Sequence, residues 1–327
     1  MALQVANIKL KRAIMLDRKA SDRGDLCLDA LTQLDLDWQL LDKADPAQLA
    51  ALIQDQQIVV TNKVVLNRAL IENAPNLKLI CISATGTNNV DLVAARERGI
   101  DVCNVTSYAT PSVVQYVFNV LLNLLCRFTE YQQAVKSGAW SRSEQFCLLD
   151  FSFRELDGKV LGIIGYGELG QAVARVAEAF GMKVLIAARN SDDQREGRWP
   201  LAELLPQLDV LSLHCPLTEE TRHVISTQEI RALPEGAILI NSARGGIVDE
   251  KALLAAIESG HLGGAATDVL TTEPPAEHHI LLQKNYPNLI VTPHIAWASI
   301  ESRQRLIDQL AFNISEYLSG RPRNIVN

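Results

Sequence analysis

The feature that most constrains the fold is a glycine-rich turn near the middle of the chain. Residues 160–164, VLGII, form a short apolar run typical of a buried strand, and ELGQAVARVAEAF after them has the spacing of an amphipathic helix. We expect Gly165 to allow a tight turn, Gly167 to leave room for a phosphate, and Gly170 to let helix and strand pack closely. The free amides at the helix start would face a pyrophosphate, which predicts a dinucleotide site.

Strands and helices alternate along the chain after this turn. Strands are expected at 160–164, 183–187, 209–213, 237–241, 263–267 and 289–292, and helices at 168–180, 200–206, 226–232 and 249–259. Six strands with helical connections make a complete doubly wound parallel sheet of the Rossmann type.

The chain before the turn shows the same alternation, so another α/β domain precedes the dinucleotide domain. Strands are expected at 13–16, 57–60, 77–82 and 101–105, with helices at 46–54, 64–72 and 90–98, and a long helix from Thr110 whose apolar stripe continues to 128. We expect the last helix, 299–319, to cross back to the first domain, because the second already has its six strands. The predicted domains are 1–105 with 298–327, and 106–297, with the active site in the cleft between them.

Composition narrows the range of partners. The chain has 327 residues, 48% of them hydrophobic, and a net charge of −7, which argues against a nucleic-acid or anionic-membrane surface. The N-terminus does not resemble a signal peptide, and the longest apolar run, 113–125, is too short to span a bilayer. Six cysteines without a C-x-x-C pattern lie mostly in apolar runs and indicate reduced core thiols. We expect a cytoplasmic protein with no membrane contact and no bound metal.

The strand that ends in LIAARN, 185–190, bears on which dinucleotide is bound. A site selective for NAD places an acid here to bond the ribose hydroxyls, but Ala188 occupies that position and Arg189 follows it. A guanidinium can pair with a 2′-phosphate, so the sequence favours NADP(H), with NAD(H) as the alternative. The alternative is that Arg189 is a solvated loop charge or stacks on adenine, which would leave the site open to both cofactors.

Polar residues follow three later strands of the second sheet. Arg244 follows 237–241, Asp268 and Glu273 follow 263–267, and His294 follows 289–292. Ligands gather at this edge of a doubly wound sheet. An arginine can bind carboxylate and carbonyl oxygens, and a histidine can give a proton to a new alkoxide. A glutamate bonded to the imidazole fixes its tautomer and favours its charged form, so the set suits reduction of a 2-oxo acid.

Each of these residues also has an ordinary structural interpretation. Arg244 could be a charge near a helix, Glu273 a solvated loop residue, and His294 a buried histidine. His214 also follows a strand and competes with His294 for the catalytic role, and spacing alone does not separate them. The neighbouring pair 278–279, both histidines in a polar loop, is expected to be solvated.

Several long segments resemble the D-isomer-specific 2-hydroxyacid dehydrogenases. They are LHCPLTEETRHVI, INSARGGIVDEKALLAAIESGHLGGAATDVLTTEPP, NLIVTPHIAWAS, SATGTNNVDL and YATPSVVQYV, which cover most of the chain in the family's order. The resemblance implies that Arg244 binds substrate, Glu273 orients the histidine, and His294 is the acid and base. It also implies a flavodoxin-like substrate domain, completed by the C-terminal helix, before the NAD(P)-binding domain.

The same resemblance assigns further site residues. The loop Ala84, Thr85 and Gly86 would bind the substrate carboxylate through its backbone amides. The cofactor positions would be Thr110, Gly165, Gly167, Glu168, Leu169, Gly170, Arg189, His214, Cys215, Pro216, Thr221, Ala243, Asp268 and Ala296, with Asp268 at the nicotinamide amide. Two positions depart from the family pattern: the acid expected near 188 is missing, and Gln115 stands where glutamate is commoner.

Within the family, the region around Trp140 and the segment FCLLDFSFRELDGKVLGIIGYG look most like glycerate dehydrogenases, also called hydroxypyruvate reductases. This resemblance implies a homodimer in which Trp140 reaches the partner's active site, and reduction of hydroxypyruvate or glyoxylate. Trp140 could instead be an ordinary interface or core tryptophan. One alternative is a reductase of the same family for another 2-oxo acid. Another is a dinucleotide-sensing binding protein, like the corepressors built on this scaffold.

Overall fold

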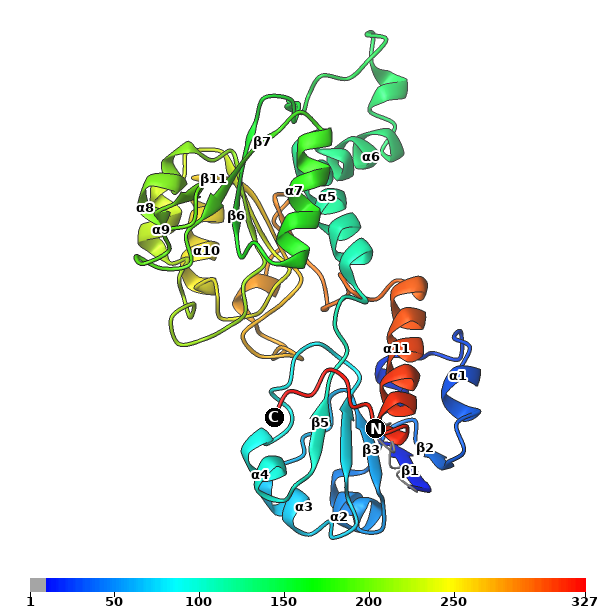
Figure 1. Ribbon diagram of the computed structural model, residues 1–327. Coiled ribbons are helices and arrows are strands. Elements are labelled where there is room, and N and C mark those ends of the chain that lie inside the picture. Colours follow the sequence, from blue (N-terminus) through cyan, green and yellow to red (C-terminus); the bar gives the residue numbers. More distant parts are fainter. Residues whose placement is uncertain (1–9) are drawn as a thin grey trace. The chain divides into compact units, whose positions relative to one another are not determined.

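The computed structural model describes residues 10–327 and shows an α/β protein with two parallel sheets (Figure 1). This confirms the predicted fold class. The chain divides into two compact units. Unit 1 contains the described residues up to Ala109 together with Trp297–Asn327, and unit 2 is Thr110–Ala296.

Unit 1 is built on a five-stranded sheet with the order β2-β1-β3-β4-β5. The strands are β1 Arg12–Met15, β2 Asp37–Leu40, β3 Ile58–Thr61, β4 Leu79–Ile82 and β5 Asp101–Cys103, and the helices are α1 Asp29–Thr32, α2 Leu49–Ile53, α3 Arg68–Glu72, α4 Leu92–Glu97 and α11 Ile300–Leu318. Every strand pair is parallel. This strand order is that of the flavodoxin-like sheet.

Strand β2 is not among the strands that the sequence predicts. Its residues, DWQL, alternate between exposed and half-buried positions at the edge of the sheet. An edge strand with one neighbour buries little surface, so it lacks the run of apolar residues that marks β3 and β4, whose residues are all buried.

Unit 2 is built on a seven-stranded sheet with the order β12-β11-β10-β9-β6-β7-β8. The strands are β6 Val160–Ile164, β7 Lys183–Ala187, β8 Arg198–Trp199, β9 Val210–Leu213, β10 Ala237–Asn241, β11 Leu262–Thr267 and β12 Leu289–Val291, and the helices are α5 Thr110–Cys126, α6 Phe128–Lys136, α7 Glu168–Ala179, α8 Leu201–Leu204, α9 Thr227–Ala232 and α10 Glu250–Glu258. Chain order reverses at β6, as in the doubly wound dinucleotide fold. The two-residue edge strand β8 adds one strand to the six expected.

Short 3-10 turns occur in both units, at Arg18–Ala20, Pro46–Gln48, Trp140–Arg142, Leu205–Gln207 and Ile280–Leu282.

The long helix predicted from Thr110 onward is broken. Arg127 has a left-handed backbone, with φ at 52°, so α5 ends at Cys126 and α6 begins at Phe128. No residue of α6 is buried, whereas α5 packs on α7 and on strands of the sheet. In residues 10–327 no single helix has the length and hydropathy to cross a membrane; α5 and α6 meet both criteria only as a pair, bent by 59°.

The core of each unit lies between its sheet and its helices. In unit 1, α11 contributes Leu306, Leu310 and Ile314, all fully buried against strands β1, β3 and β4. Their helical spacing explains why the last helix returns to the first sheet. All six cysteines are free thiols, but Cys27 is exposed, so the expectation of core thiols is wrong for this residue.

Candidate active site

The turn between β6 and α7 has the shape that the three glycines predict. Gly165 has φ at +94°, and a Cβ there would lie 2.5 Å from the amide nitrogen of Cys215. A Cβ on Gly170 would lie 2.2 Å from the carbonyl oxygen of Gly165, so helix and turn touch. A Cβ on Gly167 would meet nothing within 4 Å. The open space therefore lies at the glycine where a phosphate must approach.

The start of α7 can hold an anion. Gly167 is its N-cap, and no side chain caps the helix. The first amides of a helix lack intrahelical acceptors and form its positive end. Thr110, the first residue of α5, donates from its hydroxyl to the Glu168 carboxylate, which brings the start of α5 to this turn. Open space beside free amides fits the pyrophosphate of a dinucleotide.

The segment after β7 contains a carboxylate that counting along the sequence misses. Arg189 is exposed, and its backbone amide donates to the Asp193 carboxylate over 2.8 Å. The same carboxylate accepts two bonds from the Arg195 guanidinium, at 2.7 and 2.6 Å. These bonds hold the pKa of Asp193 below its ordinary value. An acid is thus present, but its charge is paired with Arg195.

His214, which follows β9, cannot compete with His294 as an acid near neutral pH. Its Nε2 is 2.9 Å from the Ser212 hydroxyl, and its buried Nδ1 has no hydrogen-bond partner within residues 10–327. Burial lowers the pKa of His214 from 6.5 to about 4, so its imidazole is neutral at pH 7. The buried Ser242 hydroxyl, after β10, also lacks a partner in the described chain. Buried polar atoms without a hydrogen-bond partner are expected where a bound ligand supplies the missing bond.

The loops after β10 and β11 touch at Gly245. A Cβ on this residue would lie 1.9 Å from the carbonyl oxygen of Leu270, so only glycine fits. Arg244 precedes it and is half-buried, with one guanidinium nitrogen donating to the Ala243 carbonyl over 2.7 Å. Arg244 pairs with no carboxylate of the described residues. Its guanidinium therefore has donors available for a bound anion.

Glu273 and His294 form a close pair. The Glu273 carboxylate is 2.6 Å from His294 Nδ1, and its other oxygen accepts the Leu270 amide over 2.9 Å. The two side chains are 34% and 29% exposed, so a small molecule can reach them. His294 has φ at +56°, a strained backbone that is typical of functional sites. With Nδ1 facing the carboxylate, Nε2 is the nitrogen that remains for a substrate oxygen.

Asp268 fixes the loop that carries His294. Its buried carboxylate accepts the Thr292 hydroxyl over 2.6 Å and the amides of Ile295 and Ala296 over 2.8 Å each. Its backbone carbonyl accepts the His294 amide over 2.8 Å. Burial raises the pKa of Asp268, while these donors act in the opposite direction. Each of these bonds fixes the loop, and the contact of Asp268 with the cofactor stays a prediction.

In unit 1 the loop Ala84, Thr85 and Gly86 has free backbone donors. Its carbonyls at 84 and 85 accept bonds from the Val105 amide and the Asn104 side chain. The three amides of the loop donate to no acceptor in residues 10–327. Adjacent free amides can hold a carboxylate.

Other predicted residues fall into separate places. Cys215 and Pro216 lie at the turn beside Gly165, where the Thr221 hydroxyl donates to the Pro216 carbonyl over 2.7 Å. Trp140 lies in the segment between α6 and β6, 52% exposed, and its indole donates to the Phe146 carbonyl.

Hydrogen bonds connect the three loops of the catalytic candidates, from Asn241 to Asp268 and from Asp268 to His294.

Glu250 and His279 form a pair that the sequence does not predict. His279 was expected to be solvated, but its side chain is 13% exposed and pairs with Glu250, with 3.1 Å between nitrogen and oxygen. That expectation is wrong for His279, although His278 is exposed. No sequence signal marks the pair, because its two residues are far apart in the chain.

The fold and the turn define a dinucleotide-binding protein with an acid–base pair at the edge of its sheet. The NAD-binding domain of the D-isomer-specific 2-hydroxyacid dehydrogenases matches residues 118–296. The chain is 43% identical to a glycerate dehydrogenase of Methylorubrum extorquens over 281 residues, 86% of this chain and 88% of that one. It is 40% identical to a hydroxypyruvate reductase of Blautia hydrogenotrophica over 309 residues, 90% of this chain and 95% of that one.

A solved structure agrees with these relatives. It is an NADPH-dependent glyoxylate/hydroxypyruvate reductase of Sinorhizobium meliloti, in complex with NADP and malonate, with a TM-score of 0.80, 27% identity and 97% of each chain covered. The chain therefore belongs to the D-isomer-specific 2-hydroxyacid dehydrogenase family. It is an NAD(P)-dependent oxidoreductase, which confirms the predicted family and the nicotinamide dinucleotide cofactor.

Proposed function

We propose that the protein reduces hydroxypyruvate, and also the smaller glyoxylate, with NADPH as the preferred reductant, and that hydroxypyruvate gives the D-hydroxy acid. The observation that carries the proposal is the bonded pair of Glu273 and His294, in a loop network that also holds the unpaired Arg244. The names of the two relatives and of the solved structure support this substrate class.

The proposed mechanism uses three groups of this chain. Arg244 binds the carboxylate and the 2-oxo oxygen of the substrate, and the amides of 84–86 bind the carboxylate. A nicotinamide held at the glycine turn would supply the hydride that the carbonyl carbon needs. His294 gives the proton on Nε2 to the developing alkoxide, which completes the alcohol. Glu273 accepts the other ring proton, on Nδ1, and so fixes the tautomer and the orientation of the imidazole.

The proposed preference for NADP(H) rests on Ala188 and Arg189. No acid at 188 repels a 2′-phosphate, and the carboxylate of Asp193 is paired with Arg195. Ala188→Asp should move the ratio of NADPH to NADH efficiency toward NADH by about tenfold, which equals about 1.4 kcal/mol. Ser191→Asp, which adds the same charge to an exposed position of the loop, is the control. Equal kcat/KM ratios in Ala188→Asp and the parent protein would contradict this role.

A panel of 2-oxo acids, each assayed with NADH and NADPH, tests the proposed function directly. Hydroxypyruvate should give the highest kcat/KM, followed by glyoxylate, and chiral analysis should find the D-hydroxy acid from hydroxypyruvate. A preference for a larger 2-oxo acid would overturn the substrate but keep the family. Tight cofactor binding without turnover of any acid in the panel would favour the dinucleotide-sensing alternative.

A further inference from the structure

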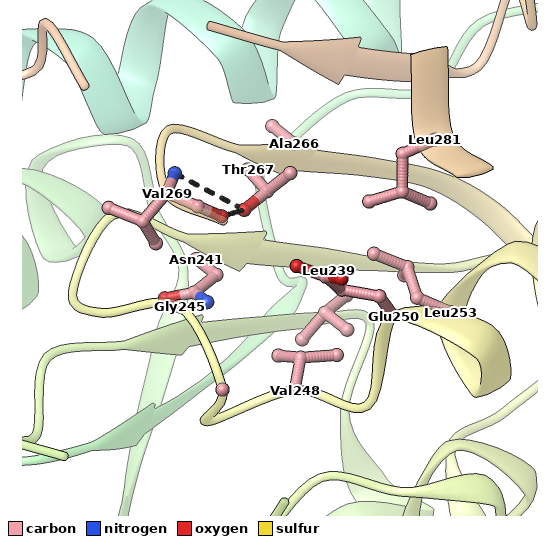
Figure 2. A pocket seen from close by; sticks show the side chains of 11 residues that line it. Leu239, Asn241, Gly245, Val248, Glu250, Leu253, Ala266, Thr267, Val269 and Leu281 are labelled. Carbon is pink, nitrogen blue, oxygen red and sulfur yellow. Dashed lines mark hydrogen bonds between the residues drawn. The ribbon is translucent and has the colours of Figure 1, made fainter. Parts of the chain in front are cut away.

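One carboxylate outside the proposed catalytic set holds the segment that carries Glu273. Glu250 is the first residue of α10, and its side chain is 19% exposed. One of its oxygens accepts the Thr271 amide over 2.8 Å, and the other is 3.1 Å from His279 Nε2. Figure 2 shows that Glu250 and Gly245 line the same small cavity. Gly245 lies on the loop that packs against Leu270.

The two bonds hold the two ends of one segment, 271–279. Glu273 lies inside this segment, where one oxygen accepts the Leu270 amide and the other faces His294. The position of the Glu273 carboxylate thus depends on where the ends of the segment are fixed. Misplacement of a catalytic group by about 1 Å is enough to reduce a rate by about a hundredfold.

The hydrogen bonds also require an acid at position 250. The Leu281 amide donates to His279 Nδ1 over 3.3 Å, which leaves the proton of a neutral ring on Nε2. Both partners of Glu250 are therefore donors. A carboxylate accepts at both oxygens, whereas the amide of glutamine accepts at one and places its own donor against the other partner.

We propose that Glu250 is a positioning residue of the active site, which holds both ends of segment 271–279 and so sets the place of the Glu273 carboxylate. The inference rests on the proposed catalytic role of Glu273. The positioning role differs from a general contribution to stability, because the effect of Glu250 is confined to the chemical step and to this segment.

Glu250→Gln is the central test, since it keeps the shape and removes one acceptor. It should lower kcat with hydroxypyruvate about ten- to a hundredfold and leave the Kd for NADPH and the melting temperature nearly unchanged. The matched control is Glu258→Gln, in the last turn of the same helix, whose carboxylate bonds Lys284 and Tyr286 instead. This control should keep the parent kcat.

His279 provides the rescue experiment. His279→Gln keeps a donor for Glu250 and should retain most of the activity, while His279→Leu should resemble Glu250→Gln. An equal loss in both His279 variants, or a Glu250→Gln protein with the parent kcat, would overturn the proposal.

Hydrogen exchange separates this proposal from the proposed function. In Glu250→Gln, peptides that cover 268–282 should exchange faster than in the parent protein, with no change in peptides of β6 and α7. Faster exchange in a protein that turns over no 2-oxo acid would keep the positioning role and reject the proposed function. Unchanged exchange with unchanged kcat in an active enzyme would reject the positioning role alone.

Discussion

His294 and His214 both follow strands of the sheet in unit 2, yet their surroundings give them different chemistry. His294 is partly exposed and bonded to a carboxylate, and His214 is kept neutral by burial. A histidine needs an accessible nitrogen and a partner for its charged form in order to serve as an acid.

Removal of the proposed acid should therefore affect the chemical step. His294→Ala should lower kcat roughly a hundred- to ten-thousandfold, the range for loss of a general acid. The Kd for NADPH, measured by fluorescence titration, should stay within about twofold, because the glycine turn is untouched. A large loss of cofactor affinity with little change in kcat would contradict the assignment.

His214 should affect stability as a function of pH. Its pKa is about 4 in the folded protein against 6.5 for a free histidine, so between these values the unfolded chain binds a proton that the folded chain does not. The free energy of unfolding should therefore fall as the pH is lowered from 6.5 to 4. At about 1.4 kcal/mol for each pH unit, this residue accounts for about 3 kcal/mol.

His214→Gln removes the titrating group, so urea unfolding between pH 7 and 4.5 should show a shallower pH dependence than in the parent protein. His223→Gln, at an exposed position, is the matched control. Identical slopes in His214→Gln and the parent protein would show that burial does not depress this pKa.

At the scale of the elements, the site consists of loops that follow parallel strands and bond to one another. The contact of Gly245 with Leu270 fixes the loop after β10 against the loop after β11. Gly245→Ala places a methyl group 1.9 Å from a backbone oxygen, so one of these loops has to move. Overpacking of this kind costs about 1–3 kcal/mol.

Gly245→Ala should therefore lower both the melting temperature and kcat/KM, because Arg244 and Glu273 lie in the two loops that touch. Thermal unfolding and steady-state kinetics measure both effects. Gly167→Ala, whose Cβ would meet no protein atom, should unfold like the parent protein and weaken cofactor binding instead. Parent-like kinetics in Gly245→Ala would show that the contact does not set the site.

At the scale of the whole molecule, the segment after α5 exposes apolar side chains. Figure 1 shows α6 and the chain after it extending beyond the sheet of unit 2 before the chain returns at β6. The exposed residues of this segment are Phe128, Val135, Trp140, Phe146, Leu149 and Phe153. Large apolar side chains that are exposed along one segment are typical of an interaction surface, which supports the proposed homodimer.

The double variant Phe146→Glu with Leu149→Glu places charges at side chains that are 89% and 78% exposed. The parent protein should be a dimer by light scattering after gel filtration, and the double variant should shift toward the monomer by at least about tenfold in Kd. Val65→Glu, at an exposed residue of unit 1, should remain as dimeric as the parent protein. A monomeric parent protein would reject the homodimer.

Local sequence patterns determined the fold class and most of the elements, because buried parallel strands and amphipathic helices carry their periodicity in consecutive residues. The sequence also predicted the glycine turn, because the roles of Gly165, Gly167 and Gly170 depend on backbone conformation within a few residues. The sequence did not predict the edge strands β2 and β8 or the break at Arg127, because short or exposed elements lack an apolar pattern.

The tertiary structure decided everything that depends on residues far apart in the chain. It separated His294 from His214 by burial, paired Asp193 with Arg195 in the segment after β7, and joined Glu250 to His279. The physical reason is that charge state and hydrogen bonding follow from distances in space, which the order of residues sets only through the complete fold.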